Sequence, residues 1–338
     1  MRAKLEDVCV RGSSNLKQSD VIDKTGEYPI YGAAGYIGNV DFYHQDQPYV
    51  AVVKDGAGIG RTSLYPAESS VIGTMQYLLP KENVLPEYLC YVVKYMHLEK
   101  YFTGATIPHI YFKDYKKEEF NLDTLDRQKE IVNILGRIEC VISSRQQELQ
   151  KLDELIKARF VELFGMPVSN TKGWSTESME DVAPIVNYKG EFHEEVWLLN
   201  LDMVEAQTGR IIDYLIVTED EVGNSTCTFD TSNVLYSKLR PYLNKVVIPN
   251  RCGYATSELV PLQPVNTKIN REYLAFMLRN DEFVNMINEK VAGAKMPRVS
   301  MNDFRKFDVP VPPIELQNQF ADFVHQVDKS KVAVLKIF

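Results

Sequence analysis

The segment from Tyr236 to Lys245 alternates cationic and hydrogen-bonding side chains with aromatic ones. Lysine and arginine bind phosphate oxygens, and arginine and asparagine can also form hydrogen bonds with the edges of bases. This composition predicts nucleic-acid contacts from Tyr236, Lys238, Arg240, Tyr242, Asn244 and Lys245. A strand whose alternate residues simply face solvent would show the same pattern, so both interpretations stay open for any single residue.

Two other loops combine cations with residues that let a backbone approach a ligand closely. Lys54 and Arg61 flank the glycine-rich residues 56–60, and glycine leaves room beside the main chain. Lys295 and Arg298 lie in a third cationic loop, beside a glycine and a proline. We expect these four cations to contact nucleic acid together with the first segment.

The sequence contains no motif that indicates a catalytic or metal-binding site. Residues 56–60 resemble a nucleotide-binding glycine loop, but a strand is expected at 61–66, where phosphate binding would need a helix N-terminus. No Asn-Pro-Pro-Tyr or Asp-Pro-Pro-Tyr element is present to hold a flipped base, because residues 311–314 lack the polar group. Neither the histidines nor the cysteines show metal-ligand spacing. We therefore predict no catalytic residue and no metal site.

Composition limits the class of protein. The 338 residues are 45% hydrophobic, which suffices for two domains, and the net charge is −8. An acidic chain can bind nucleic acid only if its cations gather on one face or a partner supplies positive charge. The chain contains no long uncharged apolar stretch and no paired cysteine motif, so we expect a cytoplasmic protein that does not enter a membrane.

The chain repeats its own plan. Residues 104–108 match residues 293–297, and residues 125–128 match residues 314–317 in the same register. The ends and connectors of the two halves agree, whereas their middles have diverged. Duplication of an ordinary domain explains the agreement, and the divergence suggests two related functions.

Between the halves lies a long helical pattern. Apolar residues alternate spacings of four and three, as in the seam of a coiled coil, interrupted by two arginines. The seam consists of Ile131, Leu135, Ile138, Ile142, Arg145, Leu149, Leu152, Ile156, Arg159 and Leu163. It is about 50 Å long at 1.5 Å per residue, so we expect the helix to act as a spacer. Asp126 is expected to cap its start, and Gly165 with Pro167 to end it.

A second helix is expected after residues 310–313. Its matching seam positions are Phe320, Val324, Val327, Lys331, Val334 and Phe338. We expect the two helices to pack as antiparallel partners. Short β-branched runs and amphipathic segments at 88–102 and 272–291 predict mixed domains elsewhere.

The predicted fold class is α+β, with two α/β recognition domains in a pseudo-two-fold repeat separated by long antiparallel coiled-coil helices. The first domain is expected at 1–120, the long helix at 121–167, the second domain at 168–309 and the short second helix at 310–338.

The pattern resembles a known family. The run at 310–317, leading into a helix, and its weaker copy at 121–128 are similar to the conserved regions of type I restriction-modification specificity subunits. Residues 28–38, 54–60 and 236–245 look like segments of the target-recognition domains of that family. Together these segments occur in the right order over nearly the whole chain.

The resemblance implies a non-catalytic subunit that recognises a bipartite sequence in double-stranded DNA. It implies a complex with methyltransferase subunits, two being expected, to which restriction subunits are added. No cofactor is expected on this chain, because S-adenosylmethionine, ATP and Mg²⁺ would bind the partner subunits.

The second helix is shorter than the first, which predicts an uncovered stripe on the first helix. Its residues are Ile131, Leu135, Ile138 and Ile142. A contiguous aliphatic stripe usually marks an interface, so we expect another polypeptide to cover it, either a methyltransferase subunit or a second copy of this chain. The alternative is that the stripe packs on the first recognition domain.

Two other functions remain open. A coiled-coil scaffold without DNA recognition would use the same helices to join protein partners, and would show no DNA preference. A standalone methyltransferase ranks third, and methyl transfer by the purified chain alone would identify it.

Overall fold

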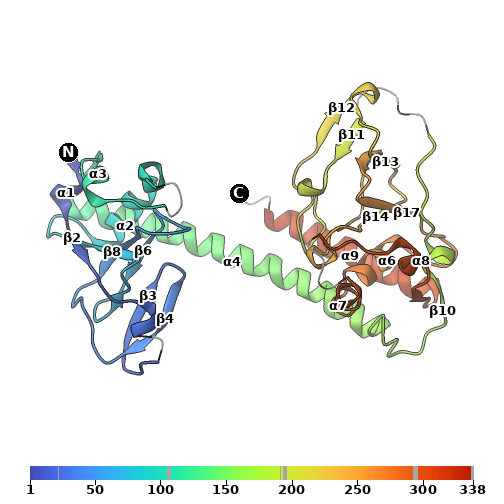
Figure 1. The fold of residues 1–338 in the computed structure, drawn as a ribbon, viewed down its shortest axis with the longest axis horizontal. Helices are drawn as coiled ribbons and strands as arrows, with labels where there is room; N and C mark the ends of the chain where they lie inside the picture. Colours follow the sequence, from blue (N-terminus) through green and yellow to red (C-terminus); the bar gives the residue numbers. More distant parts are fainter. Residues whose placement is uncertain (22, 105–107, 191, 193–195, 292–295, 336–338) are drawn as a thin grey trace. The chain divides into compact units, whose positions relative to one another are not determined.

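The computed structural model describes residues 1–338 except 22, 105–107, 191, 193–195, 292–295 and 336–338. The chain divides into two compact units, a first unit at Met1–Ser143 and a second unit at Ser144–Phe338. Both contain helices and sheets (Figure 1). No helix among the described residues is long and apolar enough to cross a membrane.

The first unit is built around a four-stranded antiparallel sheet in the order β2-β8-β5-β6. These strands are β2 (Cys9–Ser13), β8 (Met75–Pro80), β5 (Tyr49–Val53) and β6 (Thr62–Tyr65). All five residues of β5 are buried. Val50 and Val52 pack in one core with helix α2 (Pro86–Tyr95), while Tyr49, Ala51 and Val53 belong to another. A strand covered on both faces explains why its sequence is continuously apolar.

Smaller elements complete the first unit. A three-stranded sheet has the order β4-β3-β7, and a two-stranded ribbon joins β1 to β9. The bounds are β1 (Arg2–Lys4), α1 (Leu5–Val8), η1 (Gln18–Asp20), β3 (Tyr28–Gly32), β4 (Gly35–Val40), β7 (Ser70–Val71), η2 (Leu98–Tyr101), α3 (Phe112–Tyr115) and β9 (Glu119–Asn121).

The second unit repeats part of this plan. Its ribbon pairs β10 (Thr176–Ser178) with β18 (Asp308–Pro310), and its two sheets have the orders β15-β14-β17 and β12-β11-β16-β13. The sheet strands are β11 (Val196–Leu199), β12 (Leu215–Val217), β13 (Thr226–Phe229), β14 (Val234–Ser237), β15 (Val246–Val247), β16 (Gly253–Thr256) and β17 (Leu259–Leu262). The remaining helical elements are α5 (Met179–Val182), η3 (Leu201–Met203), η4 (Glu219–Glu221), η5 (Pro241–Leu243), α6 (Arg271–Arg279), α7 (Asp281–Lys290), α8 (Met301–Arg305) and α9 (Ile314–Leu335).

The expected helix at 272–291 is two helices. The chain breaks at Asn280, whose backbone is extended and whose side chain accepts a hydrogen bond from the backbone N–H of Glu282. Asparagine competes with helix continuation by capping the helix that follows. The strand expected at 61–66 is confirmed as β6, so the glycine loop before it does not lead into a helix.

Helix α4 (Leu125–Phe164) is the expected long helix, and it is shared by both units. Its start is capped by Thr124, whose hydroxyl accepts a hydrogen bond from the N–H of Arg127, and not by Asp126. Gly165 follows it with φ of 74°, in the left-handed region that glycine adopts without strain. In the first unit, Ile131 and Val132 of α4 pack against the core that contains α2.

In the second unit, the end of α4 packs antiparallel on α9. The Phe320 ring near the start of α9 lies 5.5 Å from the rings of Phe160 and Phe164, and Lys331 further along α9 forms an ion pair of 2.7 Å with Asp153. Ile156 is buried as predicted, and Leu152 and Leu163 pack partly buried against the same core. The prediction missed Phe160 and Phe164, which are buried beside the seam positions Arg159 and Leu163. The last seam position, Phe338, lies outside the described residues.

Replacing Phe320 by alanine should lower the free energy of unfolding by about 3–5 kcal/mol, since the ring is fully buried among aromatic neighbours. The half-buried Phe323 is a matched control on the same helix, and Phe323→Ala should cost about 1–2 kcal/mol. Urea denaturation monitored by circular dichroism measures both. Equal losses for the two variants would contradict this packing.

Candidate nucleic-acid interface

The two units hold their cationic loops on the same backbone framework. In the first unit, the N–H of Lys54 donates to Thr74 O (2.9 Å), and Lys54 O accepts from the N–H of Ile110 (2.9 Å). In the second unit, the N–H of Lys238 donates to Glu258 O (3.0 Å), and Lys238 O accepts from Val299 (2.9 Å). Lys54 and Lys238 are therefore structurally equivalent.

The equivalence continues through each loop. The N–H of Gly56 donates to Pro108 O (3.0 Å), and that of Arg240 donates to Pro297 O (2.8 Å). Both residues have positive φ, 90° for Gly56 and 50° for Arg240. Positive φ is uncommon for arginine. Arg240 nevertheless adopts it, so the two loops share this backbone conformation although their side chains differ.

The loops close in the same way. Val53 donates its N–H to Arg61 O at 2.9 Å, and Ser237 donates its N–H to Lys245 O at 3.0 Å. An isolated bridge pairs Asp55 with His109 in one unit, and another pairs Leu239 with Arg298 in the other. His109 therefore occupies the place of Arg298. The internal repeat pairs these two positions, but His109 was not among the predicted contacts.

The first loop carries partly neutralised charge. The Lys54 amino group lies 3.6 Å from the Asp55 carboxylate, and Nδ1 of His109 lies 2.7 Å from the same carboxylate. Arg61 is exposed and donates through Nη1 to Ala33 O at 3.1 Å. Two basic groups of this loop thus lie beside the Asp55 carboxylate, while the Arg61 guanidinium is bonded to a backbone carbonyl.

In the second loop, Arg240 has fewer side-chain contacts than the basic residues of the first loop. Arg240 is exposed, and within the described part of the chain no hydrogen bond or ion pair is recorded for its guanidinium. The Tyr242 side chain is 47% exposed beside it in sequence. Arg298 pairs with Glu258 at 2.7 Å, and Lys238 is half-buried. Arg240 and Tyr242 are thus available to a ligand.

Two predicted contacts are wrong because their side chains are buried. Tyr236 is 5% exposed and stacks on Phe304 with ring centroids 4.7 Å apart, and burial raises the pKa of its hydroxyl. The Asn244 amide donates from Nδ2 to Arg279 O at 3.0 Å inside the unit. Tyr236 lies in β14, the central strand of its sheet, whose four residues are all buried. Asn244 follows the turn η5, so strand alternation does not apply to it.

The Lys245 side chain also forms a hydrogen bond within its own unit. Its amino group donates to Leu201 O at 2.7 Å, and partial burial lowers its pKa below that of a free lysine. The remaining predicted cation of this unit, Lys295, lies outside the described residues.

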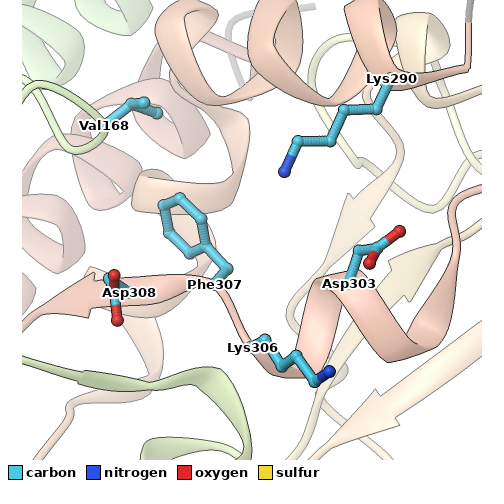
Figure 2. A pocket seen from close by; sticks show the side chains of 6 residues that line it. All are labelled: Val168, Lys290, Asp303, Lys306, Phe307 and Asp308. Carbon is cyan, nitrogen blue, oxygen red and sulfur yellow. The ribbon is translucent and has the colours of Figure 1, made fainter.

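A shallow hollow of about 330 Å³ lies elsewhere in the second unit (Figure 2). Lys290 extends from α7 toward it, and Lys306, Asp303 and Asp308 lie around its rim with Phe307. Cations and carboxylates together give no net preference for phosphate. In the described ranges, no group of three or more His, Cys, Asp or Glu residues is arranged to hold a metal ion.

Comparisons with known proteins agree on one family. The family described as "Type I restriction modification DNA specificity domain" (Methylase_S) matches residues 1–154 and again residues 172–336. The EcoDI specificity subunit of Escherichia coli is 21% identical, over 94% of this chain and 79% of that protein. The MjaVIII specificity subunit of Methanocaldococcus jannaschii is 19% identical, over 82% of this chain and 72% of that protein.

Solved structures share the fold. The S subunit of a type I restriction-modification system from M. genitalium superposes with a TM-score of 0.62 at 15% identity, covering 99% of this chain and 91% of that one. A chain from a structure describing assembly and conformational transition of the type I R-M system gives 0.51 at 12% identity, covering 100% and 92%.

Proposed function

Because the chain belongs to the family of type I restriction modification DNA specificity domains, we propose that it is the sequence-specific DNA-binding specificity subunit of a type I restriction-modification complex. Each unit recognises one half of a bipartite target in double-stranded DNA. The chain itself is non-catalytic and directs partner methyltransferase and restriction subunits, which would bind S-adenosylmethionine, ATP and Mg²⁺.

The observation that carries this proposal is the repeated loop framework with different side chains. Gly56 and Arg240 share one backbone position and one hydrogen bond, yet only arginine can form two hydrogen bonds with a guanine edge. His109 and Arg298 differ in the same manner. One scaffold with two sets of side chains suits the recognition of two different half-sites.

The proposed DNA contacts follow from exposure and charge. They are Lys54 and Arg61 in the first unit, and Lys238, Arg240, Tyr242 and Arg298 in the second. Since the net charge of the chain is −8, these few cations orient the DNA, and the partner subunits supply most of the charge that attracts phosphates.

The proposed partner interface lies on α4. Ile138 and Ile142 are 48% and 39% exposed, and Ile134 and Val141 beside them are also exposed. Ile131 packs on the core of the first unit and Leu135 is half-buried, so the proposed interface leaves both residues out. Because Ile138 and Ile142 are about half exposed, burial of each would contribute about 1 kcal/mol, and we assign this face to a methyltransferase subunit.

Arg240→Ala tests DNA recognition by the second unit. In the complex with its methyltransferase subunits, we expect the Kd for target DNA to rise about tenfold or more, and discrimination to relax in one half-site only. Arg210→Ala is the control, because Arg210 is exposed but paired with Glu205. Competition binding with single-base variants of the target measures both. Loss of discrimination in both half-sites, or in neither, would oppose the proposal.

Substituting Ile138→Glu together with Ile142→Glu tests the partner interface. We expect affinity for the methyltransferase subunit to fall at least about tenfold, because charge replaces apolar contact. The control is Asn133→Glu with Cys140→Glu, at exposed positions on the opposite face of α4.

Light scattering identifies the occupant of this face. If the unmodified chain is a dimer and the Ile138→Glu, Ile142→Glu variant a monomer, the stripe joins two copies of this chain. A folded variant whose mass and partner affinity equal those of the control would exclude an interface here.

A further inference from the structure

One buried glutamine lies at the start of each long helix. Gln128 of α4 and Gln317 of α9 are both fully buried, although glutamine usually lies at the surface. A buried amide is costly unless its donors and acceptor are all paired. Both side chains meet this condition, and they do so with equivalent partners.

In the first unit, Gln128 binds two separate stretches of backbone. Its Oε1 accepts a hydrogen bond from the N–H of Leu85 at 2.8 Å. Its Nε2 donates to Asn83 O at 3.0 Å and to Asp123 O at 2.9 Å. The side chain thereby joins the start of α4 to the segment that leads into α2.

In the second unit, Gln317 forms the same three bonds. Its Oε1 accepts from the N–H of Asn270 at 2.8 Å, and its Nε2 donates to Lys268 O at 3.0 Å and Pro312 O at 2.7 Å. It joins the start of α9 to the segment that leads into α6.

A tyrosine supports each glutamine. The Tyr88 hydroxyl donates to Asn121 O at 2.9 Å, and the Tyr273 hydroxyl donates to Pro310 O at 2.9 Å. Four hydrogen bonds at this junction therefore have counterparts in both units, and the Tyr88 hydroxyl has a second acceptor, Asp123 Oδ2, at 2.9 Å in the first unit. The residues exposed by the loops differ.

Hydrogen bonds define the direction of a helix better than apolar contacts do, because they depend on angle as well as distance. Three bonds from one amide to three fixed backbone groups constrain both distance and direction. An apolar side chain of the same size could fill the space, but it would leave those backbone groups unpaired and would not define an angle. The start of each long helix thus has a defined direction relative to the segment before α2 or α6 of its own unit.

We infer that Gln128 and Gln317 are positioning residues that fix the direction in which α4 and α9 leave their recognition domains, and so determine which number of base pairs between half-sites is accepted. This inference rests on the proposed DNA recognition. Neither residue contacts DNA in this scheme, so the bases read in each half-site should not depend on them.

The experiment uses Gln128→Met and Gln317→Met in the full chain, assembled with the methyltransferase subunits. The control is Gln146→Met, an exposed glutamine of α4. The substrates are duplexes that carry both half-sites separated by spacers of different lengths, and methylation of each is measured. We expect methylation of spacers one base pair too short or too long to rise about tenfold relative to the correct spacer, with half-site sequence preference unchanged.

A second variant guards against unfolding. Tyr88→Phe keeps the packing of the ring and removes only the hydroxyl that donates to Asn121 O, and it should broaden spacer acceptance in the same direction. Unchanged spacer preference in folded variants would overturn the inference, as would loss of folding in every junction variant, which would show a purely structural role. If the unmodified complex recognises no bipartite site, the proposed function itself fails.

Discussion

The second unit depends on the packing of four aromatic rings from three helices. Phe160 and Phe164 of α4 contact Tyr273 of α6 and Phe320 of α9, with centroid distances of 4.7–5.5 Å. All four side chains are buried, and they lie at the centre of the largest core. Because these rings come from segments far apart in sequence, the cluster ties the end of α4 and the start of α9 to one recognition domain. The Tyr273 hydroxyl also donates a hydrogen bond to Pro310 O, just before α9. Tyr273 therefore contributes both to the aromatic core and to the orientation of α9.

In the first unit, smaller side chains attach the start of α4 to the recognition domain. Ile131 and Val132 of α4 pack on the core near Tyr88, and Tyr88 and Gln128 repeat the hydrogen bonds of Tyr273 and Gln317. What duplication has preserved is therefore the attachment of helix to domain and the backbone of the cationic loop. What has diverged is the set of side chains that the loop exposes. This division allows two half-sites to be recognised by domains that share one mode of attachment.

Periodicity in the sequence predicted the two long helices α4 and α9, because a coiled-coil spacing is a local property, but it did not predict the break at Asn280. It also did not predict that Phe160 and Phe164, one residue beyond the seam positions Arg159 and Leu163, are the fully buried residues at this end of the helix, although Leu163 packs against the same core. The larger buried area of phenylalanine decides this, together with partners that lie more than a hundred residues away.

The candidate interface was harder to predict than the fold. Arg240 and Tyr242 were identified by composition and are exposed, but Tyr236 and Asn244 of the same segment are buried. A strand pattern alternates strictly, whereas this segment turns after Ser237 and takes left-handed backbone at Arg240 and Asn244. Only the three-dimensional framework shows that Gly56 and Arg240 are equivalent positions.

The central claim is that this chain alone determines the DNA sequence on which its complex acts. Genome-wide mapping of methylated bases in cells with and without the chain tests it most directly. We expect one interrupted sequence motif, with two specific halves and a constant gap, that is methylated only when the chain is present. If the same motif were methylated without the chain, or if no motif depended on it, the chain would not determine the target sequence.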